Sequence, residues 1–275
     1  MAEIKASDVA KLRQATGAGM MDCKQALTES NGDFEAAIDF LRKKGQKVAS
    51  KRADRDATEG CVIAKIADDK KNGVIVTLNC ETDFVAINAD FVKLTESFAQ
   101  IALQNKPANL EALLALKTAA GITIAEEVMN QNGVIGEKIA LSFYGCIDAA
   151  FVCSYIHPGN KLGALVGFNK DIDPLVGKNI AMQIAASKPV ALDKDQVPQE
   201  LINKEIEIGK ELAINEGKPA EMAEKIAMGR LNKYFQESTL LNQEYIMDTK
   251  KSVRQYLQEV QKDLTVVDFK LQNLG

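Results

Sequence analysis

Five cysteines and a single histidine are the residue types in this chain best suited to covalent or metal chemistry. The cysteines show no CxxC spacing, and one histidine cannot complete a credible zinc set with them. The chain contains no Walker sequence, no GxGxxG loop and no GxSxG elbow. We therefore expect a protein that is not an enzyme and carries neither cofactor nor metal. The competing hypothesis is a thiol enzyme that uses Cys80 or Cys153.

A different chemistry, insertion into another protein, is indicated where a predicted buried strand ends. Residues 74–78 favour β structure after a turn glycine, whereas residues 79–83 are typical of turns and helix caps. Phe84 follows at once. A carboxylate beside an aromatic ring at such a corner suits insertion, so Thr82, Asp83 and Phe84 are candidate partner-binding residues. The local alternative is that Thr82 or Asp83 caps the next helix and Phe84 is core.

A methionine pair, Met20 and Met21, begins a predicted helix directly after Gly17-Ala18-Gly19. Adjacent helical positions point about 100° apart, so both side chains can hardly enter the core of a small bundle. One exposed methionine would then be available as a flexible, polarizable contact for a partner. Core packing of both residues is an equally weighted alternative.

The elements that must position these residues begin with three short helices in residues 1 to about 45. Ser7 is expected to cap the first helix, which stops at Gly17, and Asp33 to cap the third, which stops at Gly45. Such a bundle is like the ubiquitin-associated type. The lysines and arginines between residues 43 and 55 predict a solvated helical linker.

An internal repeat at an offset of 90 positions, the separation of Gly73 and Gly163, organises the middle of the chain. Each unit reads as strand, turn, strand, polar tip, helix and a Lys-Pro pair. Antiparallel strands with helices on one face predict two related α+β subdomains. Residues 135–147 supply another strand for the first sheet, and residues 265–271 one for the second.

The repeat places two unusual residues at the edges of the two sheets. Phe84 corresponds to Pro174, so the architecture does not require an aromatic ring at that position. His157 lies in the strand-to-strand turn of the second unit, where a merely solvated histidine is the ordinary interpretation.

A helical hairpin is predicted at about 197–236. Pro198 opens its first helix and Pro219 its second, and Gly217 lies between them. Helices of roughly seventeen residues span about 25 Å, which suits a projecting antiparallel coiled coil. The alternative is a helical layer folded back on the core. A last helix is expected near residues 252–262.

Composition excludes several classes of partner. The 275 residues carry a net charge of −4, so broad binding to nucleic acid through its phosphates is not expected. No run of eighteen apolar residues occurs, and the N-terminal sequence lacks the pattern of a secretory signal. We expect a cytoplasmic protein with no membrane contact and reduced thiols.

Several segments together closely resemble the translation elongation factor Ts family, over nearly the whole chain. These segments are LRQATGAGMMDCKQAL (12–27), NCETDFVA (79–86), YIHPGNKLGALV (155–166), IAASKP (184–189) and EGKPAEMAEKIAMGRLNK (216–233). The resemblance implies a guanine-nucleotide exchange factor in protein biosynthesis, which binds elongation factor Tu·GDP and promotes GDP release without covalent chemistry.

The resemblance also implies an organisation. Residues 1–56 would form a ubiquitin-associated-like head with a charged linker. Residues 57–148 would form the first core subdomain and residues 149–275 the second, with the hairpin inserted. The second subdomain and the hairpin would face the partner's β-barrel domain or support self-association. Longer members of the family add a C-terminal module that touches the partner, and a chain that stops at Gly275 is not expected to make that contact.

Roles for individual residues follow from the resemblance. Asp83 and Phe84 match an acid-aromatic pair that enters the nucleotide domain of elongation factor Tu near the magnesium and phosphate side. His157 matches a residue that helps disturb the phosphate-binding loop, and Met20 and Met21 match positions that pack on a helix of the same domain. Glu81 replaces a common glutamine and is expected to add a charge beside Asp83. A binding adaptor, whose head recognises ubiquitin-like or other surfaces, is the competing class.

Overall fold

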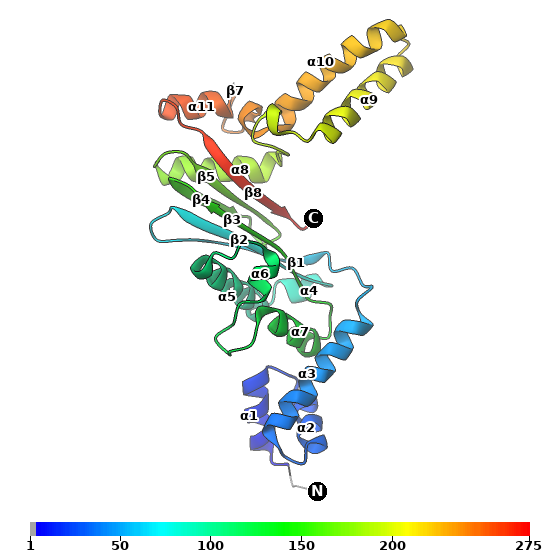
Figure 1. The fold of residues 1–275 in the computed structure, drawn as a ribbon, viewed down its shortest axis with the longest axis vertical. Helices are drawn as coiled ribbons and strands as arrows, with labels where there is room; N and C mark the ends of the chain where they lie inside the picture. Colours follow the sequence, from blue (N-terminus) through cyan, green and yellow to red (C-terminus); the bar gives the residue numbers. More distant parts are fainter. Residues whose placement is uncertain (1–3) are drawn as a thin grey trace.

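The computed structural model of the protein describes residues 4–275, except for the side chains of residues 220 and 221. Residues 1–3 of the predicted head lie outside the described residues. The expected α+β class is confirmed: N-terminal helices lie at one end of an elongated molecule, antiparallel sheets in the middle and a helical pair at the other end (Figure 1). No helix in the described part of the chain has the length and apolar character needed to span a bilayer.

Three helices form the N-terminal end: α1 (Ala6–Thr16), α2 (Met20–Glu29) and α3 (Phe34–Lys51). α1 ends at Gly17 in a left-handed conformation, with φ 70°, as predicted. Asp33 caps α3 as predicted, because its side chain accepts a hydrogen bond from the Ala36 N–H at 3.0 Å. The predicted cap at Ser7 is wrong: α1 already includes Ala6, and its N-cap residue Lys5 makes no side-chain cap bond.

Gly45 does not end α3, which continues for six more residues to Lys51. The glycine instead lets α3 cross α7 (Ile124–Ile135) at very close range. A Cβ on Gly133 of α7 would lie 2.7 Å from the Gly45 Cα. The helix stop was therefore a wrong interpretation, because a glycine needed for close packing and a glycine that ends a helix look the same in sequence.

The first sheet has the strand order β1-β2-β3 and is antiparallel throughout. Its strands and the helices associated with it are β1 (Glu59–Ile66), β2 (Asn72–Cys80), β3 (Ala140–Asp148), α4 (Asp83–Ala86), α5 (Ala89–Asn105), α6 (Leu110–Leu114) and α7. Phe91, Phe98 and Leu113 of these helices are buried in one core with Val74, Val76 and Leu78 of β2. The whole of β2 is buried, as its apolar sequence predicts.

The second sheet has the order β4-β5-β8 and is also antiparallel. It and its associated elements comprise β4 (Phe151–Ile156), β5 (Leu162–Phe168), α8 (Pro174–Ser187), η1 (Lys194–Gln196), η2 (Leu240–Asn242), β6 (Glu244–Tyr245), β7 (Asp248–Ser252), α11 (Val253–Val260) and β8 (Val266–Asn273). The predicted last helix and last strand are both present, and a capping box at Ser252 begins α11.

The helical pair α9 (Gln199–Asn215) and α10 (Ala220–Ser238) projects from the body of the molecule (Figure 1). It is therefore not a layer folded back on the core. Small residues face each other inside the pair, and a Cβ on Gly209 would lie 3.1 Å from the Ala227 Cα. Larger apolar side chains stay exposed on its outside: Ile208, Leu212, Ile214, Met222 and Met228.

The two sheets are joined by a small apolar core and by two matching hydrogen bonds. Val62, Ile75, Ile147, Val152 and Leu165 are buried between them. The Val62 N–H donates to the Asn160 carbonyl at 2.7 Å, and the Val152 N–H donates to the Lys70 carbonyl at 2.6 Å. Each bond runs from the first strand of one sheet to the turn of the other, so the two sheets hold each other in a fixed position.

We predict that Gly73→Ala lowers the free energy of unfolding by about 1–3 kcal/mol through overpacking. A Cβ at this position would lie 2.8 Å from the Val152 Cγ1 and 2.9 Å from the Leu165 Cδ1 of the other sheet. The control is Gly229→Ala in α10, where a Cβ meets nothing within 4 Å. It should raise stability by about 0.5–1 kcal/mol. Urea unfolding midpoints measure both, and equal stability of the two variants would contradict the prediction.

Candidate partner-binding site

The end of β2 and the start of α4 form a corner that presents Asp83 and Phe84 to solvent. The Phe84 side chain is 80% exposed and Asp83 is exposed. Among the described residues nothing hydrogen-bonds to the Asp83 side chain, and Thr82 makes no side-chain cap bond to α4. The local alternative for this corner is therefore wrong: Phe84 is not core, and neither Thr82 nor Asp83 acts as a side-chain cap.

The corner is held from the inside by hydrogen bonds. The Glu137 carboxylate accepts the N–H groups of Glu81 and Thr82 at 3.0 and 3.1 Å and the Thr82 hydroxyl at 2.6 Å. The Cys80 thiol donates to the Thr82 carbonyl at 3.1 Å. Thr82 is thus half-buried and engaged within the protein, while the two residues after it are free to contact a partner. Sequence reasoning missed Glu137, which lies just after the helix-ending Gly136 with no local pattern to mark it.

Glu81 does not project beside Asp83 as expected. Both of its carboxylate oxygens accept from the Arg52 guanidinium at 2.8 Å, and one accepts from the Lys138 N–H at 2.6 Å. Burial opposes ionisation, but the Lys138 N–H and Arg52 together lower the pKa of Glu81. The predicted solvated helical linker is largely confirmed, because α3 continues to Lys51 and most of the charged side chains between residues 43 and 56 are exposed. Its end is nevertheless bonded to this corner, through Arg52 and through the Lys138 ammonium, which donates to the carbonyls of residues 53 and 55.

His157 lies exposed at the start of the β4–β5 turn, as its sequence position predicts. The Tyr155 hydroxyl lies 2.8 Å from its Nδ1 and fixes the orientation of the imidazole. Sequence reasoning missed Tyr155, although alternation along a strand places residues two apart on the same face. The ordinary solvated interpretation is compatible with this exposure.

The turn that carries His157 lies close to the corner that carries Asp83. Lys161, at the end of the turn, pairs with Glu59 at 2.6 Å, and Glu59 is the register partner of Cys80. The bond to Glu59, opposed by desolvation and aided by the more distant charge of Asp83, raises the pKa of Lys161. The structure therefore brings the turn that contains His157 to the end of β2, three residues before Asp83.

Met20 and Met21 are both exposed, by 46% and 76%, at the start of α2. The loop before them and the corner at Phe84 line the same groove, which has a volume of about 710 Å³. Residues from the head, α4, α5 and α7 line this groove, among them Gly17, Phe84, Phe91, Leu94 and Val134. The alternative that both methionines are core is wrong, and Gly17 in the loop before them lines the same groove as Phe84.

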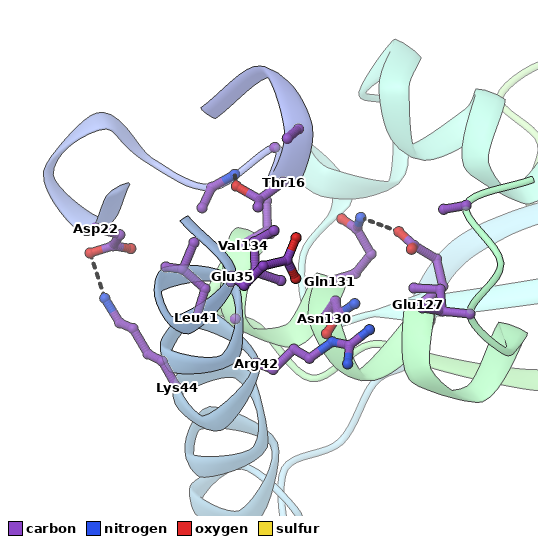
Figure 2. A pocket seen from close by; sticks show the side chains of 17 residues that line it. Thr16, Asp22, Glu35, Leu41, Arg42, Lys44, Glu127, Asn130, Gln131 and Val134 are labelled. Atoms are coloured by element: carbon purple, nitrogen blue, oxygen red, sulfur yellow. Dashed lines mark hydrogen bonds and ion pairs between the residues drawn. The ribbon is translucent and has the colours of Figure 1, made fainter. Parts of the chain in front are cut away.

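A second cavity, of about 490 Å³, lies between the head and α7 beside the close crossing of α3 and α7 (Figure 2). Polar partners on its rim are joined in pairs, Lys44 with Asp22 and Gln131 with Glu127. Val134 lines both this cavity and the groove beside Phe84. The loop that precedes Met20 therefore lies next to Val134 of α7, and a cavity borders this contact on each side.

The cysteines have the character of structural residues. Burial raises the pKa of Cys61 to about 11, and burial together with the charge of Glu137 raises that of Cys80 to about 12. Burial also raises the pKa of Cys153. A thiol held protonated is a poor nucleophile, so the thiol-enzyme alternative gains no support. Within residues 4–275, no group of three or more histidine, cysteine or acidic side chains is arranged to hold a metal ion.

Comparisons with known proteins give a consistent result. The family model described as "Elongation factor TS" matches residues 81–275. A protein of Porphyromonas gingivalis named "Elongation factor Ts" is 52% identical, over 96% of this chain and 95% of its own length. Relatives with the same name from Christiangramia forsetii and Cytophaga hutchinsonii are 51% and 50% identical; the first covers 100% of both chains and the second 98%.

We predict that Phe84→Ala changes the free energy of unfolding by less than about 0.5 kcal/mol, because the side chain is mostly exposed. Phe91→Ala, seven residues along, should cost about 3–5 kcal/mol, because Phe91 is only 3% exposed. Chemical unfolding of the two variants measures the difference. A large loss in Phe84→Ala would show that this ring stabilises the fold.

Proposed function

Because the chain belongs to the elongation factor Ts family, it is a nucleotide-exchange factor for elongation factor Tu, and we propose that the Asp83-Phe84 corner is the part that loosens the nucleotide. As a member of this family it acts in the cytoplasm, performs no covalent chemistry and has no cofactor of its own. The single observation that carries the proposal is the exposure of Phe84, an aromatic ring that the fold holds in solvent.

Exchange requires reciprocal coupling: a factor that weakens nucleotide binding is itself displaced when nucleotide binds. Mg²⁺ demands near-ideal octahedral geometry, so a small displacement of its ligands weakens the metal and then the diphosphate. We propose that Phe84 enters the partner's nucleotide domain near this site with Asp83 beside it. Thr82 supports the pair from within, through its bonds to Glu137.

The magnitude of the effect requires more than one contact. Burying a phenylalanine side chain contributes roughly 1.5–3 kcal/mol. Moving a two-state equilibrium from 1:99 to 99:1 takes about 5.5 kcal/mol of differential binding. Phe84 therefore needs anchors, and we assign that role to the exposed Met20 and Met21 on the head and to His157 on the second sheet, with His157 acting toward the phosphate-binding loop.

We propose that the core consists of two related subdomains, residues 57–148 and 149–275, behind a ubiquitin-associated-like head of residues 1–56. Pairing register supports the relation. Val62 pairs with Thr77, and the residues 90 positions later, Val152 and Gly167, also pair.

Irregularities in the two sheets repeat at the same offset. In the first sheet the register against the third strand shifts between Thr77 and Leu78, and in the second between Gly167 and Phe168. The two helices that follow the tips also end alike, with Lys106 and Lys188 in the left-handed conformation at φ 46° and 44°. Independent folds would have no reason to share both features.

The projecting helical pair supplies a second contact in this proposal, because its outer surface exposes the apolar side chains named above. The contact is made either with the β-barrel domain of elongation factor Tu or with a second copy of this chain. The mass of the complex in solution distinguishes the two, since self-association doubles the number of copies.

We predict that Phe84→Ala slows release of fluorescent GDP from elongation factor Tu by about 10- to 100-fold at a fixed concentration of the factor, the equivalent of roughly 1.5–3 kcal/mol. Met247→Ala is the control, because Met247 is also exposed but lies in the turn after β6. Stopped-flow fluorescence with excess unlabelled GDP gives both rates. If Phe84→Ala stimulates GDP release at the wild-type rate, Phe84 has no part in the mechanism. Unstimulated release by the wild-type protein would favour the adaptor alternative.

We predict a smaller effect at the second sheet, about 3- to 10-fold slower GDP release for His157→Ala, as expected for an exposed polar contact worth about 1 kcal/mol. Tyr155→Phe removes only the hydroxyl that orients the imidazole and should cause part of that loss. The same release assay reports both variants. If each matches the wild type, His157 is an ordinary solvated turn residue.

A further inference from the structure

Two glutamates stabilise the exposed corner, and the carboxylate of each accepts hydrogen bonds from the backbone of the segment that contains or adjoins the other. Glu137 accepts the backbone N–H groups of residues 81 and 82, and Glu81 accepts the backbone N–H of Lys138, the residue after Glu137. The bonds therefore run in both directions between segments 81–82 and 137–138. We call this arrangement the glutamate clasp.

Charge-assisted hydrogen bonds to a carboxylate are shorter and stronger than neutral ones. Glu137 receives three donors at 2.6–3.1 Å, which is close to the full capacity of a carboxylate at a half-buried site. The Arg52 guanidinium neutralises Glu81 and so allows two carboxylates to lie in the same small region.

We propose that Glu137 is a positioning residue for nucleotide exchange: it fixes Thr82 from behind so that Asp83 and Phe84 present to the partner in one arrangement. The inference rests on the proposed function of the corner and extends it to a residue that need not touch elongation factor Tu. Phe84 is 80% exposed and gains little orientation from packing, so the bonds at residues 81 and 82 supply it.

Removal of the Glu137 carboxylate leaves two N–H groups and a hydroxyl without an acceptor at a half-buried position. Such donors must reach water, and the corner rearranges to allow it. A small misplacement of a group that acts by geometry can cost as much as 100-fold in rate. The loss should therefore appear in the rate of exchange rather than in docking of the remaining surface.

Glu137→Gln should restore the arrangement. Its amide oxygen can accept the two backbone N–H groups, and its NH₂ can donate to the Thr82 hydroxyl, which both donates and accepts. Glu137→Ala and Glu137→Gln therefore form a matched pair that differs in acceptor geometry. Glu111→Ala controls for loss of a glutamate, because Glu111 is exposed at the start of α6, makes no hydrogen bond or ion pair through its side chain in the described structure and lies outside the contacts proposed above.

The test is stopped-flow release of fluorescent GDP from elongation factor Tu over a range of factor concentrations. Glu137→Ala should lower the rate at saturation by about 10- to 100-fold without raising the half-saturating concentration. Glu137→Gln and Glu111→Ala should behave as the wild type. If Glu137 only stabilised the fold, the opposite pattern would appear. Part of the Glu137→Ala protein would be unfolded, so the half-saturating concentration would rise while the rate at saturation stayed the same.

A second readout follows amide hydrogen exchange of the free protein, where Glu137→Ala should speed exchange in residues 81–86 and leave β2 protected. The proposal is overturned if Glu137→Ala reaches the wild-type saturating rate, or if Glu137→Gln is as slow as Glu137→Ala. Phe84→Ala is measured alongside. If Phe84→Ala is slow and Glu137→Ala is not, only the clasp fails, whereas a fast Phe84→Ala overturns the proposed function and the clasp with it.

Discussion

The close packing of the two sheets is the constraint on which the rest of the structure depends. Gly73 and Gly163 are the second residues of β2 and β5, and a Cβ on either would lie within 3 Å of a side chain in the opposite sheet. That approach permits the paired hydrogen bonds from Val62 and Val152 to the opposite turns. Close-packed interiors are hardly compressible. The corner of the first sheet and the β4–β5 turn of the second therefore keep a fixed distance and orientation relative to each other.

The same packing explains how a protein can hold an aromatic ring in water. Phe84 has little contact with the core, and its position comes instead from buried β2 on one side and from polar bonds to Glu137 on the other. The Arg52–Glu81 pair then joins the end of α3 to this corner. Head, corner and histidine turn are thus linked through a few identifiable contacts, which is the arrangement that a factor needs if several weak contacts are to act together on one nucleotide.

Local patterns in the sequence were sufficient for most of the fold. The two strands of each unit, the hairpin prolines Pro198 and Pro219, and the Asp33 cap follow from propensities within a few residues. The failed prediction at Ser7 is local, because α1 begins one residue earlier, but the failures that concern the site and the packing of the helices depend on distant contacts. Gly45 was interpreted as a helix stop because its contact with Gly133 is 88 positions away, and Glu81 was expected in solvent because Arg52 and Lys138 are not its neighbours in sequence. Glu137 went unrecognised because only the folded structure brings it to the candidate site, whereas Tyr155 could have been identified from its position two residues before His157.

The central claim is that Phe84 and His157 lie on one rigid surface and meet the same partner together. Hydrogen–deuterium exchange of this protein, alone and with nucleotide-free elongation factor Tu, tests it most directly. We expect residues 81–87 and 155–161 to become protected together on binding, while β2 and β5 are already protected in the free protein. Protection of another surface, with exchange at both of these segments unchanged, would contradict the account.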